Sequence, residues 1–379
     1  MGRKYFVIGT FFGLQLRIDY SWLIIFVLIA WTVITSYIPS YKHGLPAWQA
    51  TGAGLIVTVI FFLSVIAHEY AHSIVANHRG LRIRRITLFI FGGASELQHE
   101  PASAATEMLM TVAGPLTSFL IAGVFAVLTL LASHIGLTAM AVICQPVAVL
   151  NLVVGIFNIV PAFPLDGGRI LRATIWYLSK NLTTATRWAT NTGVAISYVM
   201  IAGGLLSILA GDLIGGLWLG IIGFFLLQSA RLSYSQIVAQ NILSGIHVRD
   251  VYSQQLVTVP LGTSVDTFLT DFVLRYKQYD FLATDQSGTP VGIIELARIK
   301  KQARLIGKQP VDPYLLPLGK TLRLRLDDPA LNALQVMQTH NVDLVPVTNG
   351  EELTGVVLRH YLEDYVRVHQ LRQANKFSG

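Results

Sequence analysis

The residues with the clearest chemical potential in this chain are His68, Glu69 and His72. Side chains four residues apart share one face of an α-helix, so both imidazoles can reach a single Zn²⁺ while the glutamate beside them serves as a general base. The three residues follow a largely apolar run over residues 55–67. Ionisable side chains at membrane depth are costly and mark functional sites. The pattern therefore predicts a catalytic metal site inside a membrane span.

A third metal ligand must come from elsewhere, because a catalytic zinc generally takes three protein ligands and leaves one position for water. The best candidate is Asp166, where an apolar stretch breaks down among Pro161, Pro164 and two glycines, so that its carboxylate can turn inward. Asn158 lies close to the same break. Its amide either donates a hydrogen bond to a developing oxyanion or ties two spans together.

These residues need membrane helices to position them, and six apolar stretches are long enough to cross a bilayer. We expect the spans near residues 19–39, 52–75, 107–132, 139–161, 190–210 and 212–230. The fourth should be interrupted by Pro146 and end as irregular backbone. After the second span, residues 82–91 have strand character, and residues 94–98 are expected to pair back as a hairpin. Such a sheet would offer an edge to an extended peptide substrate, with a plain connector as the alternative.

The composition divides the chain into a membrane part and a soluble part. Of the 379 residues 53% are hydrophobic and only 13% are charged, against about a quarter charged in soluble domains. The deficit lies in residues 1–230, which predicts a polytopic α-helical domain there. A linker is expected over 231–246 and a soluble α/β domain over 247–370.

The net charge of +7 favours an oriented membrane protein over a nucleic-acid-binding one. With six spans and the N-terminus inside, nearly every basic residue of the membrane part falls on one side, the pattern that orients membrane proteins. This predicts a multi-pass protein of the cell membrane with its N-terminus and soluble domain in the cytoplasm. Glu96, Glu100 and Glu107 are near the site in sequence and are expected on that cytoplasmic face, not as metal ligands.

The soluble part contains an internal duplication. Strand, helix, strand, turn, strand and helix occur in the same order over about 247–302 and again over about 320–370. The first helix of each repeat is expected at 265–276 and 330–340. Such repetition indicates two copies of one supersecondary unit.

Taken together, the motifs of residues 1–230 resemble the site-2 protease family of intramembrane zinc metalloproteases. The resemblance rests on HExxH at 68–72, N-x-x-P-x-x-x-x-D-G from Asn158, Ala113-Gly114-Pro115 and the Gly92-Gly93 pair. It implies that His68, His72 and Asp166 bind zinc, one ion per chain. It further implies that Glu69 activates water and that Asn158 stabilises the transition state. One departure is Ser118, where many members carry asparagine.

The C-terminal repeats resemble a pair of cystathionine-β-synthase-like (CBS) domains, a combination found in the six-span branch of the family. CBS pairs usually hold an adenine nucleotide between their repeats. Neither repeat matches the nucleotide-binding pattern. At the corresponding positions the first repeat has Glu295 and Arg298, and the second has Leu358 and Tyr361. Nucleotide sensing and homodimerisation through the pair therefore both remain open.

The resemblance implies an endopeptidase that cuts transmembrane segments of membrane-anchored proteins, with the CBS pair regulating or dimerising it. Two alternatives belong to other classes. A CBS-regulated divalent-cation transporter or channel would show repeated halves and acidic residues along a pathway, whereas here the intramembrane charge gathers at one site. A catalytically silent scaffold would lack some of the ligands, and all are present.

Overall fold

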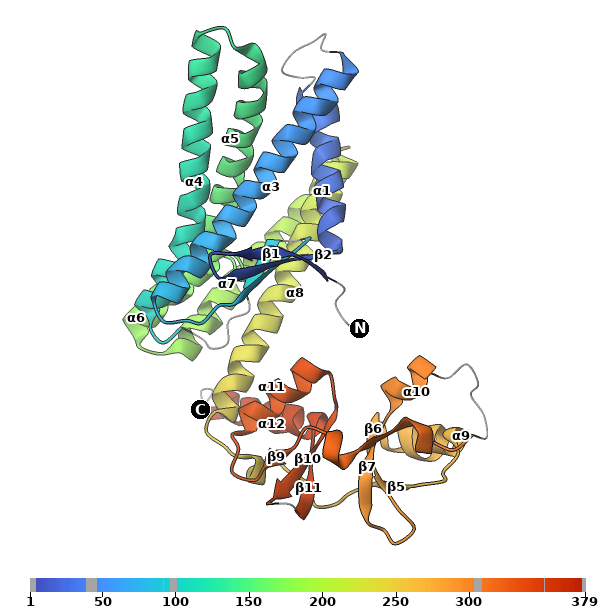
Figure 1. Cartoon of the computed structure of the whole chain (residues 1–379). Helices are drawn as coiled ribbons and strands as arrows, with labels where there is room; N and C mark the ends of the chain where they lie inside the picture. The colour runs from blue at the N-terminus through green and yellow to red at the C-terminus, as the bar shows by residue number, and fades with distance from the viewer. Residues whose placement is uncertain are drawn as a thin grey trace. The chain divides into compact units, whose positions relative to one another are not determined.

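Figure 1 shows a computed structural model of the chain, which describes residues 5–38, 46–90, 92–95, 101–302, 309–350 and 352–376. The chain divides into two compact units, Met1–Tyr234 and Ser235–Gly379. Each unit contains its own clusters of buried apolar side chains.

Among the described residues, five helices are long and apolar enough to cross a bilayer. They are α3 (Ala47–His78), α4 (Ala104–His134), α5 (Thr138–Ile159), α7 (Leu182–Leu209) and α8 (Leu213–Leu243). A shorter apolar helix comprises α1 (Ser21–Thr32) and η1 (Val33–Tyr37), and it corresponds to the predicted span over 19–39. Apolar side chains such as Leu120 and Leu130 of α4 are exposed, as contact with lipid requires. The structure thus establishes five of the six predicted spans by length.

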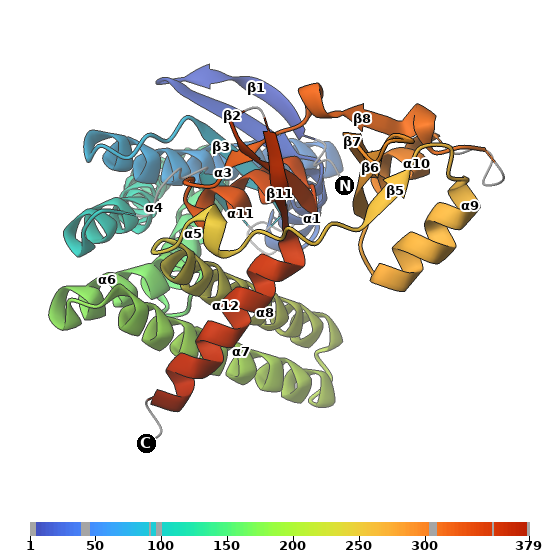
Figure 2. The same cartoon turned by 90° about the horizontal axis from the view of Figure 1, so that it is seen from below.

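The break after the fourth predicted span is present, with two differences from expectation. Pro146 lies inside α5 without ending it, so the predicted interruption there is wrong. A proline removes a single helical hydrogen bond, which packing against neighbouring helices can offset. Residues 160–165 are non-helical, as predicted, and α6 (Asp166–Ser179) then begins, a helix that was not predicted. Figure 2 shows α6 lying alongside α7.

A four-stranded sheet lies next to α3 in the first unit (Figure 1). Its strands are β1 (Tyr5–Phe11), β2 (Leu14–Asp19), β3 (Arg85–Phe89) and β4 (Gly92–Ser95), in the order β1-β2-β3-β4. The pairing of β2 with β3 is parallel and the other two pairings are antiparallel. The sequence predicted β3 and the end of β4 but not β1 or β2. Residues 96–98 of the expected hairpin lie outside the described residues.

The sheet corrects one prediction about substrate pairing. The strand expected over 82–91 is β3, and it is paired with β2 on one side and with β4 on the other. Neither of its edges is therefore open to a peptide. The strand at that end of the sheet is β4, whose outer edge has no partner strand among the described residues.

Apolar side chains anchor the sheet against the second half of α3. Leu14 and Leu16 of β2 and Ile86 of β3 are buried together with Tyr70 of α3 and Met110 of α4. The alternating buried pattern of β2 is what one covered sheet face requires. This packing fixes β3 and β4 beside the turn of α3 that carries the two histidines.

The second unit contains the predicted duplication. One sheet has the order β5-β6-β7-β8 and the other has the order β11-β10-β9. The first sheet consists of β5 (Thr258–Pro260), β6 (Asp280–Thr284), β7 (Pro290–Glu295) and β8 (Leu315–Pro317). The second consists of β9 (Leu324–Arg325), β10 (Leu344–Asn349) and β11 (Glu352–Leu358). The helices are α9 (Val265–Thr267) continued by η3 (Phe268–Leu274), then α10 (Leu296–Gln302), α11 (Ala330–His340) and α12 (Arg359–Lys376). Single helical turns occur at η2 (Val248–Asp250), η4 (Asp312–Tyr314) and η5 (Leu318–Lys320).

The two repeats share a buried interface within this unit. Leu282 of β6 packs with Leu344 of β10 and Val356 of β11. At its edge the carboxylate of Asp280 accepts a hydrogen bond from the backbone N–H of Asp343, 2.7 Å away. Burial, together with the neighbouring carboxylates of Asp343 and Glu295, raises the pKa of Asp280 to about 6. This interface therefore contains an acid that titrates in a mildly acidic range.

Candidate metal centre

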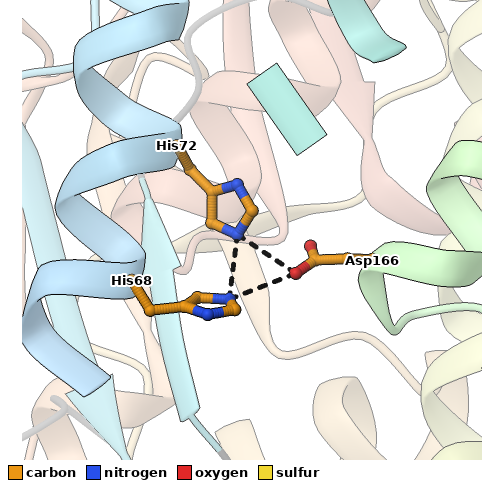
Figure 3. A group of neighbouring side chains, drawn as sticks. All are labelled: His68, His72 and Asp166. Carbon is orange, nitrogen blue, oxygen red and sulfur yellow. Dashed lines mark hydrogen bonds and ion pairs between the residues drawn. The ribbon is translucent and has the colours of Figure 1, made fainter. Parts of the chain in front are cut away.

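Two imidazoles from α3 form one side of the site. His68 and His72 are one helical turn apart and both are buried. Their Nε2 atoms lie 3.1 Å apart, and the ring planes are inclined at 81°. Figure 3 shows the two rings directed toward the same point. The i, i+4 spacing has thus placed both nitrogen donors together, as the sequence predicted.

The third group is Asp166, the first residue of α6. Its Oδ2 atom lies 3.2 Å from the Nε2 atom of His68 and 3.2 Å from that of His72 (Figure 3). Among the residues that the structure describes, these three side chains form the one cluster of His, Cys, Asp or Glu groups that could bind a single metal ion. Ligands at zinc–nitrogen and zinc–oxygen bond lengths on a tetrahedron are about 3.3 Å apart. Two nitrogens, one oxygen and these separations fit Zn²⁺.

Contacts from α4 orient both imidazoles. The Nδ1 atom of His72 lies 2.7 Å from the carbonyl oxygen of Met110, and Nδ1 of His68 lies 2.9 Å from Oγ of Ser118. A carbonyl oxygen only accepts, so Nδ1 of His72 carries the proton and Nε2 presents its lone pair to the centre. Neither contact was predicted from the sequence, where Ser118 was noted only as a departure from the family pattern.

A glycine lets α4 approach the imidazoles this closely. A Cβ atom built on Gly114 would overlap the ring atoms of His72 and His68. The Ala113-Gly114-Pro115 motif therefore has a steric role, because any side chain at position 114 would push against both rings.

Glu69 lies beside this cluster and outside it. The side chain is half-buried, and its Oε1 atom accepts a hydrogen bond from the backbone N–H of Gly93, 3.3 Å away. A Cβ atom on Gly93 would overlap the Glu69 carboxylate, so this glycine permits close approach of β4. A carboxylate next to three ligand atoms, but separate from them, is what a general base requires.

Comparison with known proteins gives the family. The sequence pattern described as Peptidase family M50 matches residues 56–144 and 133–203. The protein named zinc metalloprotease Rip3 from Mycobacterium tuberculosis is 30% identical over 375 residues, which cover 97% of this chain and 94% of that protein. The chain belongs to peptidase family M50. The zinc metalloprotease MJ0392 of Methanocaldococcus jannaschii is 28% identical over 323 residues, which cover 85% of the M50 peptidase described here and 88% of that relative.

Two solved structures are also similar to stretches of this M50 peptidase. The Site-2 Protease from Methanocaldococcus jannaschii is 25% identical and covers 60% of this chain and 94% of its own, with a TM-score of 0.43. A CBS-domain containing protein from Agrobacterium tumefaciens is 17% identical and covers 31% of this chain and 92% of its own, with a TM-score of 0.28.

The family establishes the class of protein. This M50 peptidase is a zinc metalloprotease embedded in the membrane through several helices, and Zn²⁺ is its metal. The assignment favours the peptidase over the cation transporter and the silent scaffold considered from the sequence.

Asn158, the remaining candidate from the sequence, lies half-buried in the last turn of α5. The carbonyl oxygen of the next residue, Ile159, meets the backbone of Gly167 so closely that a Cβ there would overlap it. Because Gly167 follows Asp166, this contact brings the end of α5 against the start of α6 in the M50 peptidase.

The structure corrects the prediction that Glu107 lies on the cytoplasmic face. This side chain is fully buried on α4 and paired with Arg172 of α6. The other two glutamates with the same expectation, Glu96 and Glu100, lie outside the described residues. The partner of Glu107 is distant in sequence, so local pattern could not reveal the pair.

Proposed function

We propose that this peptidase hydrolyses peptide bonds within transmembrane segments of membrane-anchored proteins, and that His68, His72 and Asp166 hold its Zn²⁺. The convergence of two Nε2 atoms and one Oδ2 atom within 3.2 Å of one another carries this proposal. The helices that supply the histidines and orient them, α3 and α4, are long and apolar enough to cross a bilayer.

The side chains around the centre have separate tasks in this proposal. Bound Zn²⁺ supplies Lewis-acid activation of water and of the scissile carbonyl. Glu69 accepts the proton that water loses as it attacks, and it passes that proton to the leaving nitrogen. Asn158 donates an amide N–H to the carbonyl oxygen as negative charge develops there.

The edge of β4 is the proposed place for substrate pairing. The N–H of Gly93 donates to Glu69, so this strand lies beside the base. An extended substrate segment added to that edge would have its backbone held beside the carboxylate. A helical segment must unwind first, because its peptide bonds are shielded by their own hydrogen bonds.

For the remaining organisation we propose a membrane domain over 1–230, a linker over 231–246 and a CBS pair over 247–370, with the N-terminus and the pair in the cytoplasm. In this proposal the pair regulates or dimerises the enzyme.

The test is proteolysis of candidate single-span proteins reconstituted with the full-length enzyme in liposomes. Intact-mass mapping should show a cut inside the substrate's apolar segment, lost with a zinc chelator and restored by added Zn²⁺. Cuts that persist under chelation, or cuts confined to soluble parts of the substrates, would contradict the proposal.

A further inference from the structure

We propose that the buried ion pair between Glu107 and Arg172 positions Asp166, and that both are positioning residues of the metal centre. This inference rests on the proposed function, because it takes Asp166 to be a zinc ligand. Neither residue touches the three ligand atoms, so the pair would act through the helices that carry it.

The pair is fully enclosed. Glu107 is 0% exposed and Arg172 is 2% exposed. The Nε atom of Arg172 donates to Oε1 of Glu107 over 2.8 Å, and a terminal guanidinium nitrogen contacts the same oxygen. The Nε atom of Arg169 lies 3.7 Å from that oxygen as well. Charges buried to this degree persist only when they are paired, so α4 and α6 are held together at this point.

The same two helices carry parts of the metal centre. On α6, Arg172 lies in the second turn after Asp166. On α4, Glu107 lies one turn before Met110, whose carbonyl oxygen accepts from His72. The ion pair is therefore connected to the metal centre in two ways. Through α6 it is connected to Asp166, and through α4 it is connected to Met110, whose carbonyl oxygen contacts His72.

The start of α6 has no side-chain cap, so the ion pair adds to the close packing of Gly167 and Gly168 in holding it in place. Asp166 follows the non-helical residues 160–165, and the residue that precedes the helix, Leu165, makes no side-chain cap. The Arg172 guanidinium also lies over the ring of Phe163, 5.3 Å from its centroid. One side chain thus fixes both the helix that begins with Asp166 and the segment that leads into it.

The experiment measures zinc affinity by chelator competition on the detergent-purified full-length protein. Glu107→Asp and Arg172→Lys keep the charges but alter the fork geometry, so both should weaken zinc binding about 10-fold or more, the range for residues that support ligands. Substitution of Co²⁺ gives a second readout, since a displaced carboxylate changes the visible absorption bands. Arg187→Lys, an exposed position on α7, is the matched control.

A purely structural pair would give a different result. In that case Glu107→Asp and Arg172→Lys would lower the unfolding temperature of the zinc-free and zinc-loaded protein equally. The zinc affinity and the Co²⁺ bands would stay as in wild type, and this result would overturn the inference. A double variant gives a second test. If the pair acts through Asp166, Glu107→Gln should cause no further loss of zinc affinity in a protein that already carries Asp166→Asn. An additive loss would also overturn the inference. The proposed function fails separately, if Asp166→Asn alone binds zinc as wild type does.

Discussion

The hydroxyl oxygen of Ser118 lies 2.9 Å from the Nδ1 atom of His68, on the side of the ring opposite the metal centre. Both residues are buried, so water does not replace this contact readily. We expect Ser118→Ala to weaken zinc binding about 10-fold, because a ligating imidazole relies on the partner of its second nitrogen. Chelator competition measures the change. Thr117→Ala is the control, since the Thr117 hydroxyl donates to the carbonyl oxygen of Ala113 on its own helix.

A methyl group at position 114 should disrupt the centre sterically. Gly114→Ala places a Cβ against both imidazoles, and overpacking of this kind costs about 1–3 kcal/mol. We expect the zinc content of the purified variant to fall while its helix content stays as in wild type by circular dichroism. Gly123→Ala on the same helix meets nothing within 4 Å and should keep its zinc. Equal zinc content in the two variants would show that the approach of α4 does not matter.

Removal of the proposed base should separate metal binding from catalysis. We expect Glu69→Gln to retain one zinc per chain, because Glu69 lies outside the three-ligand group. Its rate of substrate cleavage should fall by about 10²–10⁴, the range for loss of general acid–base catalysis. Wild-type turnover by a zinc-loaded variant would rule out the assignment of Glu69 as the base.

The interface between the CBS-like repeats should respond to pH through Asp280. Its pKa is about 6 in the folded protein and 3.8 ordinarily, so the folded state binds the proton more tightly. The free energy of unfolding should therefore decrease as the pH rises from about 4 to about 6, by about 3 kcal/mol for this group, and stay level above that. Asp280→Asn should remove this part of the pH dependence. The measurement is thermal unfolding of the full chain at pH 4 to 7, and an identical pH profile in both proteins would contradict it.

The proposed metal-binding residues could be identified from the sequence because each lies in a short local motif. His68 and His72 satisfy a helical spacing, and Asp166 follows a visible break in an apolar stretch. The residues that support them could not be found in this way. Met110, Ser118 and the Glu107–Arg172 pair contact groups dozens of positions away, and nothing in their local sequence identifies those partners.

The helix α6, which the sequence did not predict, begins with two glycines after Asp166. Gly167 and Gly168 disfavour a helix by propensity. The structure gives the reason for them: a Cβ on Gly167 would overlap the carbonyl oxygen of Ile159, and one on Gly168 would overlap the backbone of Phe163. Close packing of α6 against the preceding segment thus overrides local propensity, and only the tertiary structure reveals it.

The zinc content of Asp166→Asn, measured per chain by elemental mass spectrometry, tests the central claim most directly. Two imidazoles remain in this variant, but the oxygen that lies 3.2 Å from both is no longer a carboxylate. We predict about one zinc per chain in wild type and in the surface control Asp266→Asn, and a large loss from Asp166→Asn under the same chelator wash. Full zinc occupancy in Asp166→Asn would contradict the assignment of this side chain as the third ligand.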